Sequence, residues 1–138
     1  MTPTGDVRLR VSGRKNLEES MVATNSYALR TVNGMIDKIN KNPFCFRCVG
    51  STDLALAEVA AGQLDDFYDC RCHIWDLAAG YLLVQEAGGV VQTWDGKKDL
   101  QSVLKENGVL ATSLDLREKV LNFINPKEKT CKKKKKSV

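Results

Sequence analysis

The sequence predicts an α/β domain, a layered sheet with flanking helices, and three observations support this fold class. Short strand-like segments alternate along the chain with helix-like segments, and glycine-containing turns join them. One predicted helix, at residues 73–87, is apolar on almost every side, which is typical of a helix held between two layers. The 138 residues are 43% hydrophobic, which is enough for one buried core. We therefore expect one domain over residues 1–126.

The first elements follow from hydrophobic periodicity. Residues 7–11 alternate apolar and charged side chains, which predicts a strand with one face in water. Apolar residues at helical spacing and the Asn42-Pro43 stop predict a helix that begins at Ser26. The expected order after the first strand is helical turn, strand, helix and strand, at residues 16–19, 20–24, 26–40 and 44–49.

The second half of the chain repeats this alternation. Gly50 predicts a sharp turn, Ser51 an N-cap, and Gly62 the end of the helix between them. Ser113 predicts the cap of a last helix that runs to Ile124. The remaining expected elements are a helix at 54–61, a strand at 64–68, the apolar helix at 73–87, and strands at 90–94 and 109–111.

Charge and cysteine content place the chain in a broad class. The seven lysines and one glutamate of residues 127–138 carry +6, which leaves −2 on residues 1–126 out of a total of +4. This low-complexity tail is expected to be disordered. A solvated basic end is the favoured interpretation, with an anionic membrane or nucleic acid as weaker alternatives. Five cysteines and no signal-like segment indicate reduced thiols and a cytoplasmic protein.

The most informative segment is His73–Gly89, with the sequence HIWDLAAGYLLVQEAGG. Its first acid, Asp76, lies at the start of an apolar helix. There it can cap the helix and complement its dipole, worth about 1 kcal/mol, or it can bind a charged ligand. The residues by themselves leave both interpretations open.

A set of short motifs in register resembles the second half of the inositol monophosphatase family of magnesium-dependent phosphomonoesterases. The motifs are a Gly-Ser turn at Gly50, an A-A-G-x-L-D segment ending at Asp65, and W-D-x-A-x-G at Trp75–Gly80, followed by Glu86-Ala87-Gly88-Gly89. The resemblance covers roughly residues 6–125. It implies a fold like the C-terminal part of these sugar phosphatases.

The resemblance also implies roles for individual residues. Asp76 would hold catalytic Mg²⁺, and Gly50, Ser51, Thr52 and Asp69 would shape the substrate side. The implied substrate is a small phosphorylated sugar or polyol. Inositol phosphate, fructose bisphosphate, histidinol phosphate and a 3′-phosphoadenosine nucleotide all remain open.

The acidic metal segment of the family's first half, D-P-x-D-G-[ST], is missing from this sequence. A single carboxylate cannot supply the oxygen ligands that Mg²⁺ requires. We therefore expect a partial enzyme that forms a homo-oligomer or binds a partner chain with the missing half. The alternative is a noncatalytic subunit or binding module, with apolar faces exposed by the missing half.

Two cysteine motifs resemble a zinc site. They are Cys45-x-x-Cys48 and Cys70-x-Cys72-His73. Residues i and i+3 of a strand point to opposite faces, so Cys45 and Cys48 are not expected to converge on one ion. Buried free thiols are the favoured interpretation.

Overall fold

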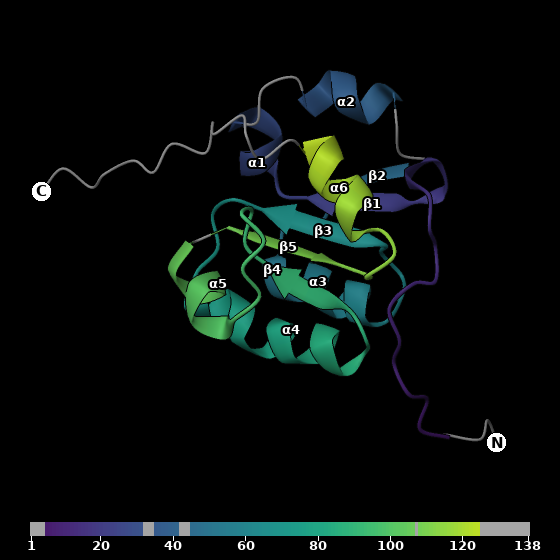
Figure 1. Cartoon of the computed structure of the whole chain (residues 1–138), viewed down its shortest axis with the longest axis vertical. Helices are drawn as coiled ribbons and strands as arrows, with labels where there is room; N and C mark the ends of the chain where they lie inside the picture. Colours follow the sequence, from purple (N-terminus) through teal and green to yellow (C-terminus); the bar gives the residue numbers. More distant parts are fainter. Residues whose placement is uncertain (1–4, 32–34, 42–44, 107, 125–138) are drawn as a thin grey trace, which may run out of the picture.

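The chain folds into three layers, with a central sheet between two groups of helices. The structure, a computed structural model, describes residues 5–31, 35–41, 45–106 and 108–124. Helices α1, α2 and α6 cover one face of the sheet, and α3, α4 and α5 cover the other (Figure 1). The predicted α/β class, a layered sheet with flanking helices, is confirmed.

The elements agree with most of the expected positions. The strands are β1 (Met21–Thr24), β2 (Cys45–Cys48), β3 (Asp66–Asp69), β4 (Val90–Gln92) and β5 (Val109–Thr112). The helices are η1 (Leu17–Glu19), α1 (Ser26–Thr31), α2 (Met35–Lys41), α3 (Thr52–Ala60), α4 (Ile74–Glu86), α5 (Leu100–Glu106) and α6 (Arg117–Ile124). The sequence did not predict α5. The lysine-rich tail lies outside the described residues.

The five strands are ordered β2-β1-β3-β5-β4. β1 pairs in parallel with both β2 and β3, whereas β5 is antiparallel to β3 and β4. The chain therefore leaves β1 to form β2 on one side and then crosses back to form β3 on the other. In parallel sheets, ligands bind at the carboxyl ends of strands where the chain reverses direction in this way.

Two hydrophobic clusters hold the layers together. Alternate residues of β3 point to opposite faces, so Phe67 belongs to the cluster under α3 and α4, and Tyr68 to the cluster under α6. Gly80 allows α4 to pack closely on α3, because a Cβ at this position would lie 2.6 Å from Leu56 Cβ. The sequence of the two helices thus fixes how α4 packs beside the sheet.

Two predicted elements are wrong. Residues 7–11 form no strand in the described part of the chain: Val11 donates a backbone hydrogen bond to the Ala87 carbonyl, but no described strand pairs with these residues. The single helix at 26–40 is instead two helices, α1 and α2, separated by residues 32–34, which the structure does not describe.

Helix α4 differs from the expectation of a helix held between two layers. Leu77, Gly80 and Val84 are buried against α3 and the sheet, whereas Leu82 and Leu83 are exposed on the opposite side. Among the described residues, no second layer packs on that side, so only half of the apolar surface of α4 is covered. No described helix is long and apolar enough to cross a bilayer.

Candidate functional site

The candidate residues lie where β1 and β3 end and where α3 and α4 begin. Asn25 directly follows β1, Asp69 is the last residue of β3, and Thr52 is the first residue of α3. Hydrogen bonds connect all three of these side chains. The topology therefore brings together most of the residues that the sequence singled out, at the point where the chain reverses direction.

The Gly50-Ser51-Thr52 turn has the form that the sequence predicted. Gly50 has a φ of 80°, a value that glycine adopts without strain. Ser51 is the N-cap of α3, and its Oγ accepts a hydrogen bond from the Leu54 N–H at 3.4 Å. Hydrogen bonds from the Ser51 hydroxyl and the Leu54 amide lower the pKa of exposed Asp53. The first amides of α3 have no acceptor within the helix, so this end of α3 suits an anion or a hydroxyl oxygen.

Asp69 holds this turn in place from the interior. It is 2% exposed, and Oδ2 accepts hydrogen bonds from Asn25 Nδ2 at 2.7 Å and Thr52 Oγ1 at 3.2 Å. Oδ1 accepts from the backbone N–H groups of Cys70 and Arg71. Asp69 therefore lies beside the turn, and its carboxylate is occupied by protein donors rather than turned toward solvent.

Asn25 is a site residue that the sequence reasoning missed. Its Nδ2 donates to Asp69 Oδ2 and lies 3.1 Å from Thr52 Oγ1, and its Oδ1 accepts from the Gly50 N–H at 3.1 Å. One side chain thus joins the end of β1 to the turn before α3 and to the end of β3. A polar residue directly after the buried strand Met21–Thr24 was the signal that could have identified it.

Cys72 lies between the two predicted acidic site residues. Burial raises the pKa of its thiol, and the charges of Asp69 and Asp76 raise it further. The thiol is therefore protonated at neutral pH and inert. Asp69 ends β3, and Asp76 lies in the first turn of the helix that follows this strand.

Asp76 is a half-buried residue in the first turn of α4. Its Oδ2 accepts a hydrogen bond from the His73 N–H at 3.1 Å, which is the capping interaction that the sequence allowed. Among the described residues, Oδ1 has no hydrogen-bond donor. The carboxylate therefore caps the helix through one oxygen and leaves the other for a ligand.

The edge of the site carries two ring contacts. His73 stacks on Trp75, with ring centroids 4.6 Å apart and an interplanar angle of 14°. The Arg71 guanidinium lies over the Tyr27 ring, 5.1 Å from its centroid. Arg71 is exposed and its backbone N–H donates to Asp69 Oδ1, so its positive charge lies beside the end of β3, where it favours anionic ligands.

The donor set does not make a complete magnesium site. Within the described part of the chain, no group of three His, Cys, Asp or Glu residues could hold a metal ion. Mg²⁺ prefers six oxygen ligands, and Asp76 offers a single oxygen. Two surface hollows, of about 270 and 500 Å³, are lined by other residues, so neither provides a wall in front of Asp76. No disulfide joins any of the four cysteines in the described residues.

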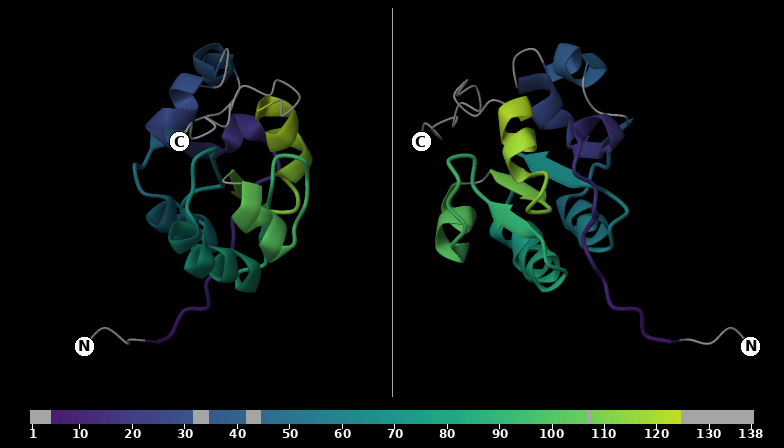
Figure 2. Two further views of the ribbon diagram at one scale, coloured as in Figure 1. Left: turned by 90° about the vertical axis from the view of Figure 1, so that its left-hand side faces the viewer. Right: turned by 45° about the vertical axis from the view of Figure 1, so that its right-hand side comes forward.

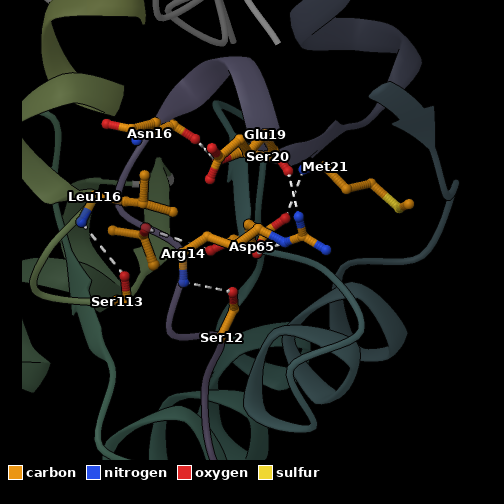
Figure 3. A network of polar contacts seen from close by, with 10 residues as sticks. Ser12, Arg14, Asn16, Glu19, Ser20, Met21, Asp65, Ser113 and Leu116 are labelled. Carbon is orange, nitrogen blue, oxygen red and sulfur yellow. Dashed lines mark hydrogen bonds and ion pairs between the residues drawn. The ribbon is translucent and has the colours of Figure 1, made fainter. Parts of the chain in front are cut away.

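Asp65 and Asp66 lie apart from Asp69. Both are buried at the opposite end of β3. Asp65 accepts from the Met21 N–H at 2.6 Å and pairs with Arg14 at 3.3 Å (Figure 3). Asp66 has no hydrogen-bond partner among the described residues, and burial raises the pKa of its carboxyl well above the usual range, with a further contribution from Asp65.

Known proteins share both the sequence pattern and the fold. The model of the inositol monophosphatase family matches residues 4–130. The fructose-1,6-bisphosphatase/inositol-1-monophosphatase of Thermotoga maritima is 35% identical over 118 residues, which are 86% of this chain and 44% of that protein. The Nus factor SuhB of Pseudomonas aeruginosa is 36% identical over 129 residues, with 86% and 45% covered.

A solved structure of the Thermotoga maritima IMPase superimposes with a TM-score of 0.79 at 31% identity, over 90% of this chain and 48% of that one. The chain thus spans a little under half the length of the relatives it matches.

Proposed function

Because this chain belongs to the inositol monophosphatase family, we propose that it supplies one half of the active site of a magnesium-dependent phosphomonoesterase. The proposed reaction is the hydrolysis of a small sugar- or polyol-phosphate by water. The observation that carries the proposal is the hydrogen-bonded turn at the start of α3, with Asp69 at the end of β3 and Asp76 in the first turn of the helix that follows β3.

The residues of this chain divide into two roles. The turn at Gly50, Ser51 and Thr52 presents backbone N–H groups and hydroxyls to the oxygen atoms of the substrate. Asp69 and Asn25 act as positioning residues, because their hydrogen bonds fix this turn from below. In this proposal, Asp69 affects substrate binding indirectly, because it holds in place the turn that contacts the substrate.

We propose that Asp76 is one magnesium ligand and that the other ligands come from the half of the family fold that the matched segment does not cover. The donor set in the described residues is too small for the ion, and the relatives are more than twice as long as the segment matched. The complementary half would supply the acidic segment that is absent from residues 1–138. No step of the reaction is assigned to the isolated chain.

Phosphate release tests the proposal directly. The chain is assayed with Mg²⁺ on inositol 1-phosphate, fructose 1,6-bisphosphate, histidinol phosphate and a 3′-phosphoadenosine nucleotide. Each assay is run with and without the complementary segment of the Thermotoga maritima relative. Release is expected only when both polypeptides are present, and the best substrate identifies the ester. Release by the isolated chain, or none by the pair, contradicts the proposal.

A further inference from the structure

Arg71 is an exposed cation at the carboxyl end of β3, and the proposed function gives it no role. The loop after β3 crosses from one face of the sheet to the other at this residue. Cys70, before it, packs against the hydrophobic cluster under α6, and Cys72, after it, belongs to the cluster under α3 and α4. The crossing therefore buries the neighbours of Arg71 on opposite faces and leaves Arg71 itself in solvent at the end of the sheet.

The guanidinium of Arg71 is held in place without an acidic partner. Its backbone N–H donates to Asp69 Oδ1 at 3.3 Å, and its guanidinium lies over the ring of Tyr27 in α1, 5.1 Å from the ring centroid. Among the described residues, no carboxylate forms an ion pair with this guanidinium. A guanidinium that stacks on an aromatic face keeps the N–H donors at its edge available for an anion.

This contact lies at the end of the sheet where the site is built, on the side away from α4. Tyr27 follows Asn25 by two residues, and Arg71 follows Asp69 by two, so both partners come from the strand ends that hold the turn before α3. The view toward this end of the sheet places α1 and α4 on opposite sides of it (Figure 2, left). A ligand that lies across the strand ends can therefore contact Asp76 at one end and Arg71 at the other.

The other arginine at the end of a parallel strand is not available in the same way. Arg47, in the last turn of pleat of β2, directs Nη1 back along its own strand, to Cys45 Sγ at 2.7 Å and the Phe46 carbonyl at 3.1 Å. Helices α3 and α4 contain four acids and no basic residue. Arg71 is thus the arginine of these strand ends that is placed to attract an anionic group.

We propose that Arg71 forms a subsite for a second phosphate group, and that the preferred substrate is a sugar or polyol with two phosphates. The inference rests on the proposed function, in which the phosphate that is hydrolysed lies at Asp76. A guanidinium binds a phosphate through two parallel N–H···O bonds. Fructose 1,6-bisphosphate and a 3′-phosphoadenosine nucleotide have a second phosphate for this subsite. Inositol 1-phosphate lacks one, and the ammonium group of histidinol phosphate is repelled by Arg71.

Binding to the full chain without metal tests the subsite separately from hydrolysis. Calorimetric titrations are run in EDTA at about 0.15 M salt, which screens distant charges. We expect fructose 1,6-bisphosphate to bind at least about tenfold more tightly than fructose 1-phosphate or fructose 6-phosphate. Arg71→Gln should bring the three affinities to within about twofold of one another, whereas Arg71→Lys keeps the charge and should retain part of the preference. The NMR resonance of Arg71 Nε–Hε should shift more with the bisphosphate than with either monophosphate.

Arg47→Gln is the matched control, because it removes one exposed positive charge that is held against its own strand. It should keep the preference for the bisphosphate. Both arginines are exposed, so every variant should keep its unfolding midpoint. The subsite is refuted by equal affinity of the unchanged chain for the three ligands, by no binding of the bisphosphate, by a preference that survives Arg71→Gln, or by an equal loss in Arg47→Gln.

The two proposals fail in different assays. A bisphosphate preference that depends on Arg71, together with no phosphate release in the activity assay, refutes the proposed function alone. Phosphate release with inositol 1-phosphate as the best substrate refutes the Arg71 subsite alone.

Discussion

The side chain of Asn25 offers the sharpest test of how the site is built. Asn25→Ala removes the 2.7 Å hydrogen bond to the buried Asp69 carboxylate and the 3.1 Å bond from the Gly50 N–H. A hydrogen bond to a charged group contributes roughly 1.5–3 kcal/mol. The Gly50 amide belongs to an exposed residue, where water replaces the lost acceptor. This second hydrogen bond therefore contributes to stability at the low end of the usual range for hydrogen bonds.

The remaining donors limit the loss. After the substitution, Asp69 keeps the Thr52 hydroxyl and the backbone N–H groups of Cys70 and Arg71. It does not become an unpaired buried charge, which would cost about 3–5 kcal/mol. We therefore expect Asn25→Ala to lower the free energy of unfolding by about 2 kcal/mol.

Urea unfolding followed by tryptophan fluorescence measures this loss. Asn122→Ala, an exposed asparagine on α6, is the matched control and should change stability by less than about 0.5 kcal/mol. Asn25→Asp should cost more than Asn25→Ala at neutral pH, because it places a second carboxylate beside Asp69. A loss for Asn25→Ala no larger than that of the control would refute the account of how the turn is held.

Two further substitutions test the interior. Burial raises the pKa of Asp66, so its contribution to stability is full below the unfolded value of about 4 and is lost as the pH rises toward the folded value, by about 1.4 kcal/mol per pH unit. The stability advantage of Asp66→Asn over the unchanged chain should therefore grow from pH 4 to pH 7 in urea unfolding, and a pH-independent difference would contradict the burial argument. Gly80→Ala places a Cβ 2.6 Å from Leu56 Cβ, so crowding of about 1–3 kcal/mol outweighs a gain of about 1 kcal/mol in helix propensity. Thermal unfolding should show a lower midpoint, whereas a raised midpoint would mean that α3 and α4 lie further apart.

Local patterns in the sequence identified the parts of the site that local chemistry determines. The Gly50 turn, the Ser51 cap and the first turn of α4 at Asp76 each depend on a few neighbouring residues. Asn25 escaped notice because its three partners are 25, 27 and 44 residues away, and only the sheet topology brings them together.

The failed predictions have physical causes outside the local sequence. The pattern of residues 7–11 is that of a strand, but a strand requires a partner, and none lies beside it in the described chain. Apolar residues all round α4 predicted packing on every side of the helix. In the described chain, only the side with Leu77 and Val84 is packed. Both discrepancies concern apolar side chains that are exposed among the described residues.

Magnesium binding by the assembled pair tests the central claim most directly. Asp76→Asn keeps an oxygen for the His73 amide, so the helix cap survives and the charge is removed. In calorimetric titrations of the complex, we predict that this variant binds Mg²⁺ at least about tenfold more weakly than the unchanged chain. Equal affinity of the two complexes would contradict the assignment of Asp76 as a metal ligand.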